Sequence, residues 1–303
     1  MTPDLVVLGN LIVDDVVFAD GRTRMGQPGG AILYASLGAA LWGARVAIVA
    51  PVGDDYPRVT LQALESRGVD LSGLRPLGRQ GLRTWLLYEP AARRVVHQLG
   101  SPTHGEASPR PEDIRGPLAG ARAFHIAPIP VECQERLIEP LAGHAGTLLS
   151  LDPHDPLREG TLARWRPLLP RLDLLFVSEE EISLPGLDAD PAEALASLTG
   201  GRLAAIALKR GARGGLYFDA TSRRAVAWPA RVKTLADPTG AGDAFAGGVL
   251  AGRLDGLGLG DSLARGVVSA SFALDDWGSA GLLAATVAEA RRRFEAWRPA
   301  FVE

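Results

Sequence analysis

One five-residue run, Ala204-Ala205-Ile206-Ala207-Leu208, is apolar at every position. A strand of a parallel sheet can be apolar throughout because helices cover both of its faces. Similar short runs of β type lie at 5–8, 46–50, 123–126, 147–151 and 174–177. Segments of helical periodicity lie between or after these runs, at 58–67, 191–198, 245–253 and 284–297. The alternation predicts an α/β fold with a mostly parallel central sheet and helices on both faces.

Two stretches interrupt this alternation, at approximately 11–27 and 80–100. In the second, the runs 82–89 and 93–98 flank a turn at 90–92, and their residues alternate as in a two-faced hairpin. We expect a small antiparallel β sheet here, either a lid over the main domain or edge hairpins of the main sheet. No linker or repeat divides the sequence, so we expect a single domain over residues 1–303.

The composition limits the classes of function. The chain has 303 residues, 47% of them hydrophobic and 22% charged, which excludes a disordered, collagen-like or disulfide-based protein. A net charge of −3 gives no electrostatic basis for binding nucleic acid or an anionic membrane. The single cysteine, Cys133, forms no intrachain disulfide, and no uncharged apolar run is long enough to suggest a membrane span. We therefore expect a cytoplasmic protein with a small-molecule partner.

A glycine-rich loop leads into a predicted helix at Asp237-Pro238-Thr239-Gly240-Ala241-Gly242-Asp243-Ala244-Phe245-Ala246-Gly247-Gly248. The free N–H groups and positive dipole end of such a helix start favour a phosphate or a developing phosphoryl charge. Asp243 has two interpretations at this point. It is either an N-terminal cap or a base that accepts the proton of an attacking hydroxyl.

This string of twelve residues resembles the C-terminal signature of the ribokinase (PfkB) family of carbohydrate and nucleoside kinases. Other matches follow in the order and spacing of the family, nearly over the full length. They are Gly9–Asp14, Gly29–Ala35, Asp152-Pro153-His154, Ser178–Glu181 and Lys209–Gly214. The resemblance implies a ribokinase-like three-layer α/β/α sandwich with a small antiparallel β lid.

The resemblance also implies a role for each matching residue. Asp243 would be the catalytic base, and the backbone N–H groups of Gly240, Ala241 and Gly242 would form the anion hole. The acceptor would be bound by Asp14, Gly29, Gly30 and Tyr34, and the nucleotide side by Ser178, Glu181, Lys209 and Gly211. Asp237 and the carbonyl of Thr239 match positions that in many members hold a monovalent cation, commonly potassium, although loop capping also explains Asp237.

Three residues depart from the family pattern, since Tyr34, His154 and Ser178 each stand where the family has Asn. Tyr34 offers a hydroxyl and a ring face, so it either stacks on a flatter or bulkier acceptor or packs into the core. Asp15 has no match in the family, and we expect it to be solvated or part of a turn. We likewise expect Arg83, Arg93 and His97 to form a solvated face of the lid.

The resemblance therefore predicts a kinase that uses ATP and Mg²⁺ to phosphorylate a hydroxyl of a small sugar, sugar acid or polyol, an inositol-like ring included. A nucleoside kinase is the alternative within the family, and a non-catalytic regulatory or interaction member is the alternative of another class. A dinucleotide-dependent oxidoreductase is disfavoured, because Gly9-Asn10-Leu11 lacks the Gly-x-Gly-x-x-Gly pattern. The exposed face of the lid is one candidate contact for a homodimer.

Overall fold

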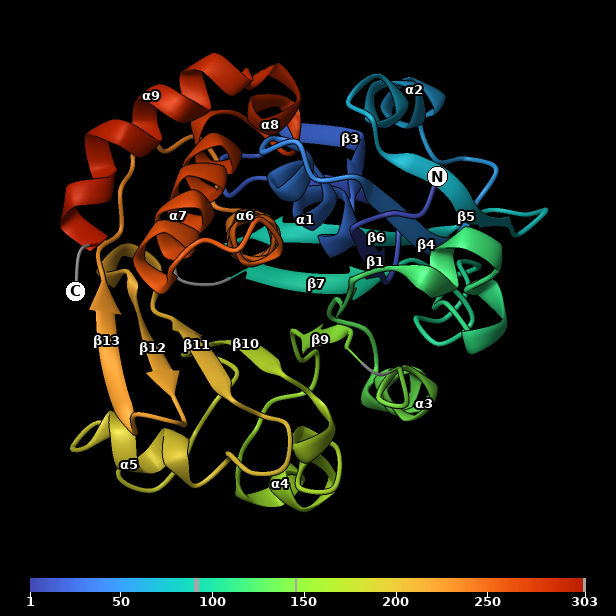
Figure 1. Ribbon diagram of the computed structural model, residues 1–303. Coiled ribbons are helices and arrows are strands. Elements are labelled where there is room, and N and C mark those ends of the chain that lie inside the picture. The colour runs from blue at the N-terminus through green and yellow to red at the C-terminus, as the bar shows by residue number, and fades with distance from the viewer. Residues whose placement is uncertain (90–92, 145, 302–303) are drawn as a thin grey trace.

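A nine-stranded sheet runs through the centre of the computed structural model, which describes residues 1–89, 93–144 and 146–301 (Figure 1). The strand order is β13-β12-β11-β10-β9-β8-β1-β4-β5. All neighbouring pairs from β11 to β5 are parallel, and β12 and β13 are antiparallel additions at one edge. The strands are β1 (Leu5–Leu8), β4 (Val46–Val52), β5 (Asp70–Pro76), β8 (Ala123–Ile126), β9 (Leu148–Leu151), β10 (Leu174–Ser178), β11 (Ala205–Lys209), β12 (Gly215–Asp219) and β13 (Arg224–Trp228).

Helices cover both faces of this sheet. Figure 1 shows α6 to α9 on one side of β9 to β13 and α4 and α5 on the other. None of the helices in the described ranges is long and apolar enough to cross a membrane. The helices are α1 (Ala31–Ala40), α2 (Arg58–Ser66), α3 (Val131–Leu141), α4 (Glu159–Trp165), α5 (Pro191–Ala196), α6 (Ala241–Leu254), α7 (Leu259–Asp275), α8 (Ala280–Ala284) and α9 (Val287–Trp297).

Strand β1 illustrates the three layers. Leu5 and Val7 belong to the hydrophobic core shared with α1, α6 and α7. Val6 and Leu8 point to the opposite face and belong to a second core shared with α3, α4 and α5. All four side chains are completely buried. Burial on both faces explains why these strands are apolar throughout, and it confirms the predicted α/β/α sandwich.

The second sheet has four strands in the order β3-β2-β6-β7 and is separate from the main sheet. The strands are β2 (Ile12–Val17), β3 (Thr23–Gly29), β6 (Leu82–Tyr88) and β7 (Arg93–His97). The pairs β2–β3 and β6–β7 are antiparallel hairpins, whereas β2 and β6, which join the two inserted stretches, are parallel. The inserted stretches are therefore not edge hairpins of the main sheet. The turn expected at 90–92 lies outside the described residues.

The first turn of α6 differs from the sequence prediction. The helix predicted to start at Asp243, with helical periodicity over 245–253, begins at Ala241, because Gly240 adopts a left-handed conformation (φ 74°) and acts as the N-cap. A glycine has no Cβ to disfavour this conformation. The glycine-rich loop therefore ends in a helix that already includes Ala241, Gly242 and Asp243.

Candidate active site

The residues singled out in the sequence gather at the carboxyl edge of the main sheet. Asp152 follows β9, Glu181 follows β10 and Gly211 follows β11, and these three strands are neighbours. Ser178 and Lys209 are direct partners at the ends of β10 and β11. Ligands of open α/β sheets bind outside the carboxyl ends of the strands, so this edge is the expected place for a site.

Close packing against α1 positions the start of α6. A Cβ at Gly38 of α1 would lie 2.4 Å from the Ala244 carbonyl oxygen, and one at Gly247 of α6 would lie 2.0 Å from the Ala35 carbonyl oxygen. The two backbones can touch only because both positions are glycine. This contact brings Tyr34 of α1 against the loop before α6, where a Cβ at Gly240 would lie 2.2 Å from the tyrosine ring.

The first turn of α6 presents backbone N–H groups at this edge. The first N–H groups of an α-helix lack acceptors within the helix and carry the positive end of its dipole. The Ala241 N–H makes a long bond of 3.4 Å to the Pro238 carbonyl oxygen. Asp243, half-buried, follows Gly242 within this turn. The turn thus combines anion-binding amides with a carboxylate, the pair that phosphoryl transfer requires.

Lys209 lies beside this turn. A Cβ at Gly242 would lie 3.4 Å from the Lys209 ammonium nitrogen. The ammonium forms an ion pair with Asp152, whose side chain is 1% exposed. The Lys209 side chain is only 15% exposed, so it does not extend from the strand end into water. A half-buried cation therefore adds positive charge next to the helix start.

The carboxylates around Lys209 keep it charged. Burial on its own would lower the pKa of Lys209, but the charges of Asp152, Glu181 and Asp243 outweigh burial and raise that pKa. Burial raises the pKa of the Asp152 carboxyl, and Lys209 opposes this effect. The second oxygen of Asp152 is buried and has no hydrogen-bond partner among the described residues. Lys209 is thus the cation that compensates a group of three acidic side chains.

Asp14 lines a small pocket between the lid and the start of α6. Thr84 of β6 donates a hydrogen bond to Asp14 through its hydroxyl group. A Cβ at Gly29 would lie 2.1 Å from a carboxylate oxygen of Asp14, and one at Gly30 would lie 2.2 Å from the Asn10 carbonyl oxygen. The two glycines therefore make room for protein atoms. The pocket is lined by Asp14, Val16, Arg24, Gln27, Pro28, Tyr34, Leu86, Tyr88, Asp237, Thr239, Trp277 and Gly278.

Tyr34 packs into the core, since it is 3% exposed, and it also lines this pocket, while stacking on an acceptor stays a prediction. Burial raises the pKa of Tyr34 well above its usual value, and the charges of Asp237, Asp14 and Asp243 raise it further. The phenol therefore remains neutral.

Asp237 caps the loop in which it lies. Its two carboxylate oxygens accept hydrogen bonds from the N–H groups of Thr239 at 2.9 Å and Gly278 at 3.0 Å, and the residue is 6% exposed. The monovalent cation at Asp237 and Thr239 stays a prediction. The Thr239 hydroxyl also lies 3.2 Å from the Tyr88 hydroxyl, so the lid contacts the glycine-rich loop directly.

The residues expected on the nucleotide side form two short turns. Glu181 accepts a hydrogen bond from the backbone N–H of Ser178 at 2.7 Å, which folds the glutamate over the end of β10. Gly211, with φ +56°, opens an exposed 3₁₀ turn after β11. Their contacts with nucleotide stay predictions.

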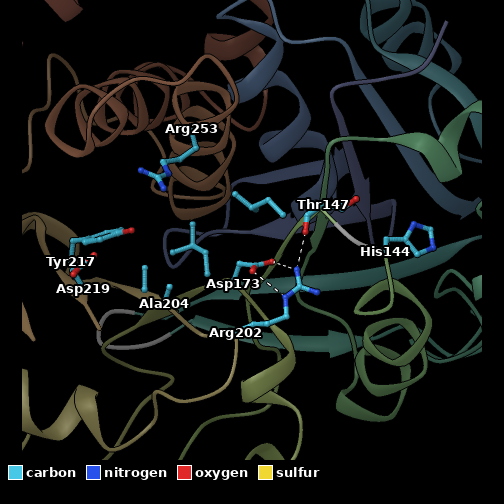
Figure 2. Close-up of a pocket in the computed structure, with 12 residues that line it drawn as sticks. His144, Thr147, Asp173, Arg202, Ala204, Tyr217, Asp219 and Arg253 are labelled. Atoms are coloured by element: carbon cyan, nitrogen blue, oxygen red, sulfur yellow. Dashed lines mark hydrogen bonds and ion pairs between the residues drawn. The ribbon is translucent and has the colours of Figure 1, made fainter. Parts of the chain in front are cut away.

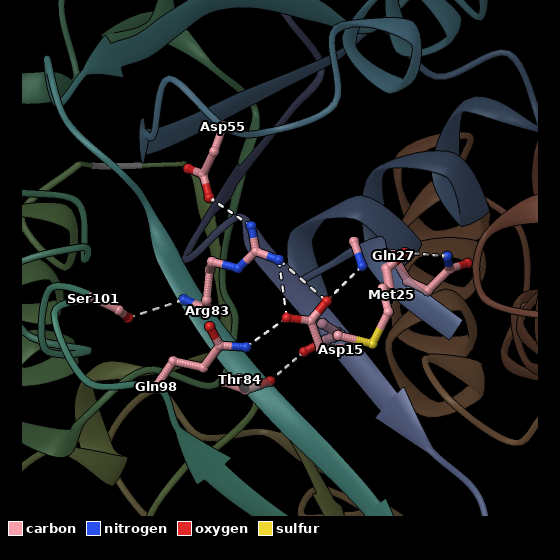
Figure 3. A network of polar contacts seen from close by, with 10 residues as sticks. Asp15, Met25, Gln27, Asp55, Arg83, Thr84, Gln98 and Ser101 are labelled. Carbon is pink, nitrogen blue, oxygen red and sulfur yellow. Dashed lines mark hydrogen bonds and ion pairs between the residues drawn. The ribbon is translucent and has the colours of Figure 1, made fainter. Parts of the chain in front are cut away.

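The expectation that Asp15 and Arg83 are solvated is wrong. Asp15 is 2% exposed and forms an ion pair with Arg83 (Figure 3). Sequence alternation does not reveal this pairing, because it depends on how β2 and β6 lie side by side. The side chain of Arg93 lies outside the description of the structure.

Sequence reasoning also missed His104. Its ring lies 4.6 Å from that of His97 on the lid and 5.1 Å from that of His154, measured between ring centres. Burial lowers the pKa of His104 to about 4, and the charges of the other two histidines add to this effect. His97 and His154 are exposed. No sequence pattern marked the cluster, since its members come from three separate segments.

A larger cavity of about 670 Å³ lies at the opposite edge of the sheet, where β9, β10 and β11 begin (Figure 2). Arg202 forms an ion pair with Asp173 there and donates hydrogen bonds to the carbonyl oxygens of Ala142 and Thr147, both at 2.8 Å. Arg202 thus holds loops together. None of the predicted site residues lines this cavity.

The profile of the pfkB family of carbohydrate kinases matches residues 3–284. The chain belongs to this family. This pfkB-family kinase is 34% identical over 285 residues to a cytidine kinase of Thermococcus kodakarensis, covering 91% of this chain and 97% of the relative. It is 29% identical over 282 residues to a fructokinase of Klebsiella pneumoniae, covering 87% of this chain and 88% of that relative.

Two solved structures share the fold of this kinase. A putative ribokinase II from Escherichia coli, in complex with ATP and Mg²⁺, superposes with a TM-score of 0.76 at 19% identity, covering 97% of this chain and 99% of that one. A nucleoside kinase from Burkholderia thailandensis, in complex with inosine, superposes with a TM-score of 0.72 at 19% identity, covering 96% and 97%. At this level of identity the likeness shows the fold alone.

The ion pair beneath the helix start predicts a stability effect. Lys209→Met leaves the buried Asp152 without its cation, and we expect the free energy of unfolding to fall by roughly 3–5 kcal/mol. Lys209→Met combined with Asp152→Asn should recover most of this loss. The matched control is Lys233→Met, because Lys233 is the other lysine of the chain and its side chain is 62% exposed. Urea denaturation measures all three, and equal stability of the two single variants contradicts the structural account of Lys209.

Proposed function

We propose that this kinase transfers the γ-phosphoryl group of ATP, with Mg²⁺, to a hydroxyl group of a nucleoside. One observation carries the proposal. Asp14, Tyr34 and Thr239 line one pocket, and Thr239 directly precedes Gly240, the N-cap of the helix that carries Asp243. An acceptor site next to an anion-binding helix start is the arrangement that phosphoryl transfer needs.

The residues of the chain have distinct roles in this reaction. Asp14 accepts hydrogen bonds from acceptor hydroxyl groups, which orients the acceptor. Asp243 accepts the proton of the attacking hydroxyl as the new O–P bond forms. The amides of Gly240, Ala241 and Gly242, together with the Lys209 ammonium, stabilise the negative charge of the transferring group. Ser178, Glu181 and Gly211 form the wall on the nucleotide side.

The acidic groups fit a magnesium ion that is held chiefly by phosphate and water. Among the described residues there is no group of three or more His, Cys, Asp or Glu side chains arranged to hold a metal. Mg²⁺ keeps several waters and commonly binds through one or two carboxylates and substrate phosphates. Glu181 would orient such waters, and bound Mg²⁺ would neutralise phosphate charge. Potassium, at Asp237 and the Thr239 carbonyl, would add a further cation beside the glycine-rich loop.

The walls of the acceptor pocket favour a nucleoside. Tyr88 and Trp277 line it together with Asp14, so aromatic side chains and a carboxylate occur in one pocket. Aromatic side chains stack on nucleobases by about 1–3 kcal/mol per base. The likeness to a cytidine kinase over nearly the whole chain supports this choice. A small sugar is the second candidate, supported by the likeness to fructokinases.

ADP release from ATP tests the class of acceptor. With cytidine, uridine, adenosine, inosine, ribose, fructose and myo-inositol at equal concentration, we expect the highest kcat/KM for a nucleoside, because only a nucleoside places hydroxyl groups at Asp14 and a base on the aromatic walls. A sugar that exceeds every nucleoside overturns the choice of acceptor. If none of these compounds raises ADP release above the acceptor-free rate, the panel counts against the kinase proposal as a whole.

Replacement of Asp243 tests the catalytic step. Asp243→Asn keeps the size of the side chain but cannot accept the proton, so we expect kcat to fall by roughly 10²–10⁴-fold. The KM of ATP should stay within a factor of about two, since the backbone amides remain in place. A kcat close to that of the parent protein removes Asp243 from the role of base.

We also propose that two copies of the chain associate through the lid. Strand β7 is an edge of the lid sheet, and Val95, Val96 and Leu99 on and just after it are 51%, 45% and 102% exposed. Exposed apolar edge strands favour pairing with another chain. Light scattering should give a dimer mass, and Val95→Lys with Leu99→Lys should give a monomer. A monomeric parent protein contradicts the contact.

A further inference from the structure

The lid sheet carries a buried charge on the residue next to Asp14 (Figure 3). Asp15 is 2% exposed, and its carboxylate accepts hydrogen bonds from Arg83 at 2.9 and 3.1 Å. It also accepts one from the Gln98 side chain at 2.5 Å and one from the backbone N–H of Gly26 at 2.6 Å. Donors from three separate segments of the lid therefore converge on a single carboxylate.

A β-bulge supplies one of these donors. Asp14 pairs with Gln27 and Val16 pairs with Arg24, so two residues of β3, Met25 and Gly26, stand opposite Asp15. Gly26 has φ +67°, the left-handed conformation that favours glycine at a bulge. The N–H group of Gly26 points to the Asp15 carboxylate. The bulge thus places a backbone N–H group where the Asp15 carboxylate can accept its hydrogen bond.

Arg83 connects this lid network to the main domain. Its other terminal nitrogen lies 3.3 Å from a carboxylate oxygen of Asp55, in the loop after β4 of the main sheet. The second oxygen of Asp55 accepts a hydrogen bond at 2.7 Å from the N–H of Gly81, where the chain enters the lid. At the same place a Cβ on Gly53 would lie 2.1 Å from the Gly81 nitrogen. The lid and the main domain therefore meet where the backbones at Gly53 and Gly81 pack closely, and Arg83 bonds a carboxylate on each side.

The same lid strand holds both acidic residues of β2. In the parallel pairing of β2 with β6, Asp14 lies opposite Thr84, which follows Arg83. Thr84 donates to Asp14, and Arg83 donates to Asp15. Successive residues of a strand point to opposite faces, so Asp14 faces the acceptor pocket while Asp15 is held behind it. The position of Asp14 over the pocket thus depends on how β6 is fixed.

We propose that Arg83 is a positioning residue for acceptor binding, which it supports by tying Asp15 of the lid to Asp55 of the main domain without touching the acceptor. The inference rests on the proposed function. The planar guanidinium is suited to this task, because one of its terminal nitrogens bonds Asp15 while the other reaches Asp55, whereas an ammonium is a point charge without such a fork. Buried ion pairs contribute little to net stability, and a role in specifying geometry is the better attested one.

Three variants test the tie. Asp55→Asn removes the charge on the main-domain side and leaves Arg83 and Asp15 intact, Arg83→Gln removes the shared cation, and Arg83→Lys keeps the charge without the fork. The matched control is Arg22→Gln. Arg22 forms an ion pair with Asp20 in the same lid, but the two side chains are 75% and 54% exposed, respectively. The readouts are the KM values of acceptor and of ATP, and hydrogen exchange of β2 and β6 in the free protein.

We expect Arg83→Gln and Asp55→Asn to raise the KM of the acceptor about tenfold or more, equivalent to about 1.4 kcal/mol. The KM of ATP should stay within a factor of about two, because the nucleotide wall lies on the ends of β10 and β11. Arg83→Lys should give an intermediate value. The double variant Arg83→Gln with Asp55→Asn should be no worse than Arg83→Gln alone, since both remove the same tie.

The proposal is overturned if Arg83→Gln and Asp55→Asn raise the KM of ATP as much as the KM of the acceptor. It is also overturned if Arg22→Gln raises the KM of the acceptor as much as Asp55→Asn does. Hydrogen exchange separates these outcomes from failure of the proposed function. If the parent protein phosphorylates no acceptor, Asp55→Asn should still speed exchange of β2 and β6 relative to Arg22→Gln. Unchanged exchange in Asp55→Asn contradicts the tie whatever the reaction is.

Discussion

Gly242 has no side chain, and the Lys209 ammonium lies in the space beside it. This contact places a half-buried cation against the first turn of α6, whose amides already favour an anion. Asp152 holds the ammonium in place, and Gly38 and Gly247 hold the helix against α1. The position of α6 therefore depends on close backbone approach, which glycine at positions 38 and 247 allows, while Lys209 lies at ordinary contact distance from Gly242.

Close contacts also hold Asp14, which lines the pocket proposed for the acceptor. Asp14 accepts a hydrogen bond from Thr84 of β6, and Gly29 leaves the space that its carboxylate occupies. Tyr34 separates Asp14 from the helix start and stays neutral among three carboxylates. Tyr88 of the lid and Trp277, which follows α7, also line this pocket.

Features that depend on neighbouring residues could be predicted from the sequence, whereas contacts between distant residues could not. The strands at 5–8 and 123–126 were predicted at their observed bounds, since an apolar run is a local property. The start of α6 was predicted at Asp243, two residues late, because the left-handed Gly240 that caps the helix is not visible in the sequence pattern. Asp15 was assigned to solvent because its partner Arg83 lies 68 positions away on a strand whose pairing the sequence does not show. The ion pair of Lys209 with Asp152 was not predicted for the same reason. Asp152 follows β9 and Lys209 ends β11, and β10 lies between these strands in the sheet.

The most direct test of the central claim is a crystal structure with ADP, Mg²⁺, a phosphoryl-transfer analogue such as aluminium fluoride, and a nucleoside that supports ADP release. The account predicts the analogue within hydrogen-bond distance of the Gly242 amide, with the Asp243 carboxylate about 2.6–3.2 Å from the acceptor hydroxyl. Binding of the analogue away from the first turn of α6, or an Asp243 carboxylate directed away from the acceptor, would contradict it.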